Sequence, residues 1–193
     1  MVRGVWLSLL LIVPTLFACT PESRNNLPDE NRVAGDSRLL GLWRAEPDSD
    51  DFRIQITQRD PLEFAVVTSE TSKTDRGGRI HIVEYNLRFF DVDGRQILAI
   101  QELNRAAGDD PSWRFATYRF DEANRATLSL MSEDRIRQLV QGGQLPGTIR
   151  GADTQLPEVL IIASRAKLVE LIRSEDPAKL FTARVGPFVR VGQ

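Results

Sequence analysis

Residues 83–89 read Val-Glu-Tyr-Asn-Leu-Arg-Phe, and every second residue of this stretch is apolar. A period of two is typical of a β-strand with one buried face and one wet face. Residues 52–57, Phe-Arg-Ile-Gln-Ile-Thr, alternate in the same way. Further short strand-like runs lie at 63–69, 96–103, 113–120 and 126–131. The chain is therefore predicted to be mainly β.

The connections between these runs are short and rich in turn-forming residues. They read Arg-Asp-Pro at 59–61, Arg-Gly-Gly at 76–78, Asp-Val-Asp-Gly at 91–94 and Asp-Glu-Ala-Asn at 121–124. Antiparallel neighbours can be joined by such turns, whereas parallel strands need crossovers of a dozen or more residues. We expect an antiparallel meander, and seven or more such strands favour a closed or nearly closed up-and-down β-barrel.

Two short helices are predicted late in the chain. The first has Ser132 as its N-cap and is stopped by Gly142 and Gly143, and its apolar stripe consists of Ile136, Leu139 and Val140. The second begins at Ser164, ends near Asp176-Pro177 and buries Leu168, Leu171 and Ile172. Between them, residues 159–163 form an uninterrupted apolar run that we expect to be a strand covered on both faces. Residues 188–191 can supply a last strand.

The N-terminus has the layout of a secretory signal peptide. Arg3 precedes an apolar run from Val5 to Phe17, and the small residue Ala18 follows. The run is shorter than the roughly 20 apolar residues of a membrane span, and Pro14 interrupts it. We therefore assign residues 1–18 to a signal peptide that is removed.

Cys19, the only cysteine of the chain, follows directly. Leu16-Phe17-Ala18-Cys19 resembles the bacterial lipobox. The resemblance implies a bacterial lipoprotein: cleavage after Ala18, a diacylglyceryl group on the Cys19 sulfur and an N-acyl chain. Because Thr20 and not aspartate follows, it also implies the outer membrane, facing the periplasm, if the source is Gram-negative. The alternative is an ordinary signal peptide with a chance cysteine.

Residues 19–36 are polar and turn-prone, and few of them are apolar. Such a stretch buries too little surface to offset the entropy of ordering. We expect a flexible tether with an end-to-end distance of roughly 20–25 Å. Residues 37–193 are then expected to form a single β-barrel domain, since one hydrophobic core suits a chain of this size.

Gly41-Leu42-Trp43, at the start of the first expected strand, resembles the Gly-x-Trp signature of lipocalin-type (calycin) barrels. The resemblance implies that Trp43 packs at the closed end of the barrel, beneath an arginine from a late strand. Arg190 is the counterpart by position. The alternative for Trp43 is a core aromatic residue with no ligand role.

Catalytic chemistry finds little support in the sequence. His81 is the only histidine, no serine lies in a Gly-x-Ser-x-Gly setting, and a zinc site lacks cysteine partners. Neighbouring carboxylates could bind calcium or hydrolyse a substrate, but they suit turns and exposed loops better; they are Asp48, Asp50, Asp51, Asp91, Asp93, Asp109 and Asp110. We predict no catalytic residues, no metal and no cofactor besides the lipid on Cys19.

Charge gives no reason to expect a nucleic-acid partner. Without residues 1–18 the chain has 24 basic and 27 acidic residues, a formal net charge of −3, and the two signs are interleaved.

Three functions remain open. We favour a non-catalytic, membrane-anchored envelope lipoprotein whose barrel docks against an envelope protein. The alternative is a carrier or sensor of a small apolar ligand, such as a fatty acid or lipid, with Trp43, Phe52, Ile54, Val83 and Tyr85 lining the barrel. A hydrolase is a distant third.

The lipid anchor predicts the behaviour of a Cys19→Ser variant. A serine hydroxyl cannot take the thioether-linked diacylglyceryl group, so the variant should leave the membrane fraction. Immunoblots of membrane and soluble fractions measure this, and a variant that stays in the membrane at the wild-type level would contradict the anchor.

Overall fold

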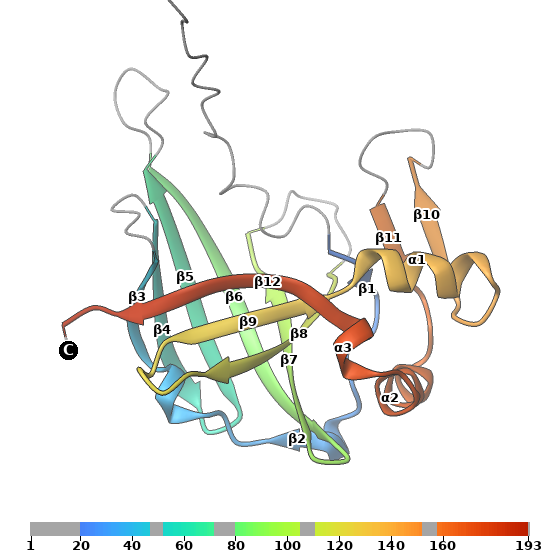
Figure 1. Ribbon diagram of the computed structural model, residues 1–193, viewed down its shortest axis with the longest axis horizontal. Helices are drawn as coiled ribbons and strands as arrows, with labels where there is room; N and C mark the ends of the chain where they lie inside the picture. Colours follow the sequence, from blue (N-terminus) through green and yellow to red (C-terminus); the bar gives the residue numbers. More distant parts are fainter. Residues whose placement is uncertain (1–19, 47–51, 72–79, 105–110, 152–157, 193) are drawn as a thin grey trace, which may run out of the picture.

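Figure 1 shows the computed structural model of the chain, which describes residues 20–46, 52–71, 80–104, 111–151 and 158–192. The expected signal peptide at 1–18 and Cys19 lie outside these ranges, and so does the expected turn at 76–78.

Eight antiparallel strands form a closed barrel (Figure 1). In chain order they are β3 (Gly41–Ala45), β4 (Phe52–Asp60), β5 (Glu63–Thr71), β6 (Ile80–Val92), β7 (Arg95–Glu102), β8 (Arg114–Phe120), β9 (Ala126–Met131) and β12 (Phe181–Arg190). Each strand pairs with the next, and β12 pairs with both β9 and β3. The predicted mainly-β, up-and-down, lipocalin-like barrel is confirmed.

Period-two alternation separates two hydrophobic cores on either side of the barrel wall. In β7, Leu98 and Ile100 belong to the core inside the barrel, while Ile97 and Ala99 belong to a core outside it. Phe89 and Phe90 in β6 are divided in the same way. The wall is thus buried on both faces here, which explains why Ile97-Leu98-Ala99-Ile100 shows no polar residue.

The outer core is covered by an insertion between β9 and β12. It contains α1 (Glu133–Gln141), β10 (Gly147–Arg150), β11 (Glu158–Ile161), α2 (Arg165–Ser174) and α3 (Pro177–Leu180). The first two helices begin as predicted, because the Ser132 hydroxyl accepts from the Arg135 N–H and the Ser164 hydroxyl from the Lys167 N–H. The third helix was not expected. Its N-cap is Asp176, whose side chain accepts from the Ala178 N–H, and Pro177 stands at the first helical position.

The strand expected at 159–163 differs from the prediction in two ways. β11 belongs to a separate three-stranded sheet with β1 (Glu22–Ser23) and β10. It is also covered chiefly on one face, since Val159 and Ile161 are buried but Ile162 is 43% exposed. An uninterrupted apolar run does not by itself distinguish one-sided from two-sided burial.

The expectation of a flexible tether is wrong for residues 20–36. This segment contains β1, a 3-10 turn at Asp29–Asn31 and β2 (Arg32–Val33), and a second 3-10 turn at Ser37–Leu39 follows it. β1 pairs with β11, and β2 pairs with β6. Leu27 is fully buried in the outer core. The folded unit therefore extends to the residues directly after Cys19.

Backbone pairing explains why so polar a segment is ordered. Ser23 exchanges two hydrogen bonds with Trp113 (2.7 and 2.8 Å), and the Arg24 N–H donates to the Ile161 carbonyl (2.9 Å). The Asn25 amide donates to the Ala163 carbonyl at 2.9 Å. Partners distant in the sequence supply these bonds, so composition alone does not reveal them.

Leu27 provides a test of this packing. Leu27→Ala removes a fully buried side chain and should lower the free energy of unfolding by about 2–5 kcal/mol. Leu62→Ala is the matched control, since Leu62 is 37% exposed and should change it by about 0.5 kcal/mol or less. Urea denaturation measures both, and equal small effects would mean that residues 20–36 do not belong to the folded unit.

Candidate functional site: the cavity of the barrel

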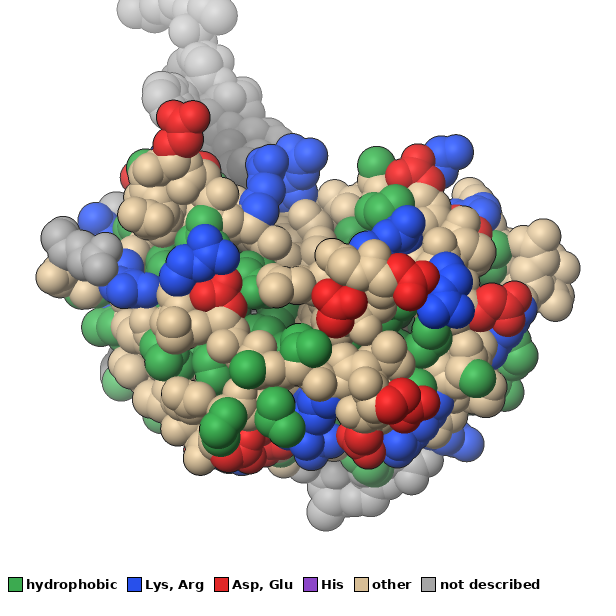
Figure 2. All heavy atoms as spheres, turned by 90° about the horizontal axis from the view of Figure 1, so that it is seen from below, with side chains coloured by type: hydrophobic (Ala, Val, Ile, Leu, Met, Phe, Trp, Pro, Cys, Tyr) green, Lys and Arg blue, Asp and Glu red, His purple; other side chains and the backbone are tan. Residues whose placement is uncertain are grey.

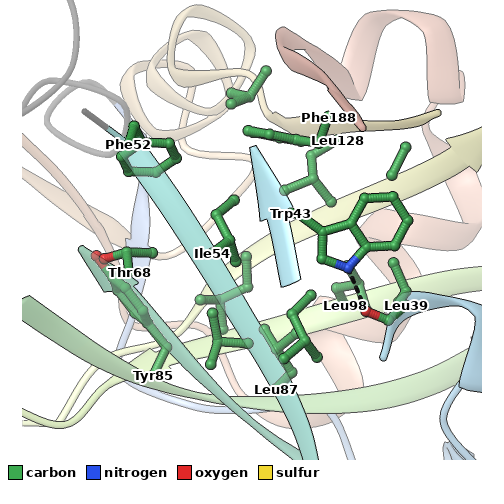
Figure 3. Close-up of a pocket in the computed structure, with 15 residues that line it drawn as sticks. Leu39, Trp43, Phe52, Ile54, Thr68, Tyr85, Leu87, Leu98, Leu128 and Phe188 are labelled. Carbon is green, nitrogen blue, oxygen red and sulfur yellow. Dashed lines mark hydrogen bonds between the residues drawn. The ribbon is translucent and has the colours of Figure 1, made fainter. Parts of the chain in front are cut away.

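An apolar cavity of about 80 Å³ lies inside the barrel (Figure 3). Four of the five residues expected to line the barrel reach it: Trp43, Phe52, Ile54 and Tyr85. Val83 packs against the same core without lining the cavity. Of the lining side chains, only Thr68 and Tyr85 carry a hydroxyl, and Figure 3 shows them together, away from Trp43.

Trp43 closes one end of the cavity, as the Gly-x-Trp pattern predicts. Its indole N–H donates to the Leu39 carbonyl at 2.8 Å (Figure 3). The Arg190 guanidinium lies 5.0 Å from the centre of the Trp43 ring, a cation–π distance, and also donates to the Arg38 carbonyl. Gly41 has φ = +126°, which only glycine adopts readily, and the Arg190 side chain packs over it. The predicted Arg190 partner is therefore present.

A hydrogen-bonded cluster fixes the turn beneath Trp43. Asp36 accepts from Arg38 at 2.7 Å, and the Tyr118 hydroxyl lies 3.1 Å from the same carboxylate. Burial, followed by the negative charge of Asp36, raises the pKa of Tyr118 above its usual range. Burial opposes ionisation of Asp36, but the hydrogen bonds from Arg38 and Tyr118 outweigh it and lower the Asp36 pKa.

Polar groups gather at the opposite end, where β5 and β7 end and β6 and β8 begin; we call this the Tyr85 end. Glu102 lies opposite Tyr85 in the β6–β7 register. Burial first, and then the negative charge of Glu102, raise the pKa of Tyr85. Arg114 forms ion pairs with Glu102 (3.5 Å) and with Glu22. The N-terminal segment thus contacts the barrel at this end.

Of the other candidate groups, two carboxylates have partners in the β6–β7 turn. His81 is exposed on β6, and Asp91 accepts from the Gly94 N–H in the β6–β7 turn at 2.8 Å. Asp93 in the same turn pairs with Arg173 at 2.6 Å. The remaining carboxylates that we considered lie outside the described residues: Asp48, Asp50, Asp51, Asp109 and Asp110. Among the residues that are described, no three metal-ligating side chains come together.

A shallow polar groove between α1 and α3 is also used structurally. Arg135 and Glu175 form a bidentate pair there with distances of 2.7 and 2.8 Å, and Ser132 and Asp176 cap the two helices.

Comparisons with protein-family models, curated proteins and solved structures found no match for this chain. The class that the fold defines is an antiparallel, lipocalin-like barrel. Within the described ranges, no helix is long and apolar enough to cross a membrane.

The sequence did not point to every residue of the cavity. Leu128 lies in the alternating run at 126–131 and could have been inferred from it. Val185 could not, because the register of β12 shifts between Val185 and Phe188 and breaks the alternation. Leu39 lies before the first strand, where period two gives no information.

The Tyr118 cluster predicts a pH dependence. The pKa of Tyr118 is higher in the folded protein than in the unfolded chain, where it is near 10. This difference stabilises the folded state fully below pH 10, and the stabilisation is lost as the pH rises through the folded-state pKa. Tyr118→Phe should cost about 1 kcal/mol at neutral pH through the lost hydrogen bond. The difference in the free energy of unfolding between this variant and the wild type should shrink above pH 10. Urea unfolding across this range measures the difference, and a constant value would contradict the assignment.

Proposed function

We propose that this chain is a lipid-anchored, non-catalytic envelope protein whose barrel holds a short length of hydrocarbon chain. One observation carries the proposal: inside the barrel lies a partly open cavity with an almost entirely hydrocarbon wall. A void of this kind excludes water and gains free energy when an apolar group fills it.

The size of the cavity narrows the class of ligand. Pockets for drug-sized ligands measure roughly 300–1,000 Å³, and an engineered cavity of about 150 Å³ binds benzene. At about 80 Å³, the barrel has room for a slim group such as the end of an alkyl chain. A bulky ring system would require the barrel wall to move.

The polar groups suggest which way such a chain lies. The Trp43 end is closed by packed side chains, so the methyl end of a chain fits there. The hydroxyls of Thr68 and Tyr85 lie at the other end of the wall, which makes this end the polar one. The Thr68 hydroxyl donates to the Val83 carbonyl at 3.4 Å, and its oxygen can accept from a protonated carboxyl group. A fatty acid or the acyl chain of a lipid combines both features.

The anchor is supported by the lipobox resemblance at residues 16–19. Each buried methylene contributes about 0.8 kcal/mol, so two or more acyl chains hold a protein stably on a membrane while one does so only marginally. The proposal includes the outer membrane, with the barrel facing the periplasm, if the source is Gram-negative.

Docking against an envelope protein, which we favoured from the sequence, stays a prediction. Figure 2 shows Lys and Arg side chains intermixed with Asp and Glu over one face, without a patch of one sign.

A medium-chain fatty acid with bromine on its terminal carbon tests the ligand proposal. Bromine quenches indole fluorescence at short range, so binding with the methyl end inward should quench Trp43. The mature protein, purified from membranes in detergent, should show saturable quenching. Trp43→Phe should abolish it, since Trp113 lies in the outer core.

Ile54→Phe provides the matched test of the cavity itself. Ile54 is half-buried in the wall, and a larger side chain there should fill the space and weaken binding about tenfold or more, equivalent to about 1.4 kcal/mol. Leu62→Phe, on the exposed β4–β5 turn, should bind as the wild type does. Equal affinities for the Ile54 variant and the wild type would place the fatty acid outside the barrel and contradict the proposal.

A further inference from the structure

We infer that the Tyr85 end of the barrel rests on the lipid bilayer, with Ile80, Ile82 and Leu103 in the membrane interface. This inference rests on the proposed anchor at Cys19 and adds to it a fixed orientation of the barrel. The bilayer is thus the partner of an apolar surface that the fold leaves open.

The folded part of the chain begins close to the predicted anchor at Cys19. Pro21 and Ser23 are buried, and Ser23 is held by its two hydrogen bonds to Trp113. A chain spans at most about 3.6 Å per residue. Cys19 therefore lies within about 14 Å of Ser23, and the acyl chains cannot be far from the surface to which Ser23 is fixed.

The surface concerned is the Tyr85 end. Glu22 forms an ion pair with Arg114 at the start of β8, and Arg114 lies opposite Ile100 near the end of β7. In Figure 1 the end of β5 and the start of β6 point to the top of the view, and β1 lies beside β11 to the right of the barrel. A lipid on Cys19 holds this end of the barrel toward the membrane.

Exposed apolar side chains gather at the same end. Ile80 is 63% exposed, Ile82 is 56% exposed and Leu103 is 39% exposed. Ile80 and Ile82 alternate with His81 and Val83 and so lie on the outer face of β6. Exposing a large aliphatic side chain to water forgoes the free energy of burying it, and contact with lipid recovers that energy.

Along β7, the outward-facing apolar side chains become exposed only at the Tyr85 end, at Leu103. It continues the outward series of Ile97 and Ala99, which the insertion covers completely. The insertion does not cover Leu103, whose N–H donates to the Glu84 carbonyl on β6 at 2.8 Å. The outer wall is thus covered by protein along most of β7 and exposes an apolar side chain at the Tyr85 end.

In this orientation, one end of the cavity faces the bilayer and the other faces away from it. The hydroxyls of Thr68 and Tyr85 lie toward the bilayer, and the closed Trp43 end lies away from it. A hydrocarbon chain that enters the barrel at the Tyr85 end would come from the membrane surface and not from bulk water.

Site-directed spin labelling of the full lipoprotein tests the orientation. Acylation blocks Cys19, so a cysteine introduced as I82C or L103C is the only free thiol. Each variant is labelled with a nitroxide and reconstituted in vesicles of phosphatidylethanolamine and phosphatidylglycerol. Collision rates with oxygen, which concentrates in lipid, and with a water-soluble nickel chelate report the depth of the label. L62C is the matched control, because Leu62 is similarly exposed on the β4–β5 turn at the far end.

We expect labels at 82 and 103 to show oxygen collisions severalfold above those at 62, with nickel collisions reduced to a similar extent. Adding Ile80→Glu to L103C should return that label to water without releasing the protein from the vesicles. Equal accessibility at 82, 103 and 62 in vesicle-bound protein would overturn the orientation and leave the anchor intact. Protein that does not float with the vesicles would overturn the anchor, and the orientation with it.

Discussion

The pairing of β12 with both β9 and β3 is the constraint on which the rest of this structure depends. Without it the sheet would have two open edges, and unpaired edges are prone to pair with other chains. The same strand carries Arg190 to Trp43, which closes one end of the cavity, and Phe188 to its wall. The insertion between β9 and β12 must therefore return the chain to a defined place. It does so by packing against the outer face of the barrel wall, so closure of the barrel and burial of the outer core are coupled.

The outer and inner hydrophobic cores have different roles. The outer core is dense and includes both longer helices and Leu27 from the N-terminal segment. The inner core keeps a small void at its centre. A wall that is packed from outside can hold its shape around a void, because protein interiors are close-packed and resist deformation. The insertion and the N-terminal segment thus support the cavity without contributing to its lining, and the same N-terminal segment would couple the barrel to the membrane.

The barrel could be predicted from the sequence because period-two alternation is a local signal. Residues 52–57 and 83–89 place one face of each strand inward without any knowledge of neighbours, and the helix caps at Ser132 and Ser164 are equally local. The position of Trp43 beneath Arg190 came from a resemblance and not from a pattern. The order of residues 20–36 escaped prediction because hydrogen bonds to Trp113, Ile161 and Ala163 produce it. The placement of β11 outside the barrel depends likewise on long-range pairing. Among the cavity residues, Val185 was hidden by the irregular register of β12.

These features describe a barrel that is closed by its last strand and supported from outside, and we propose that it holds hydrocarbon within. The location of a bound alkyl chain tests this account most directly. Crystals of the lipoprotein grown with a terminally brominated medium-chain fatty acid would show the bromine by its anomalous scattering. The account predicts a peak inside the barrel, between Trp43 and Ile54. A peak at the Tyr85 end or on the outer surface, or an interior filled by side chains with no bromine bound, would contradict it.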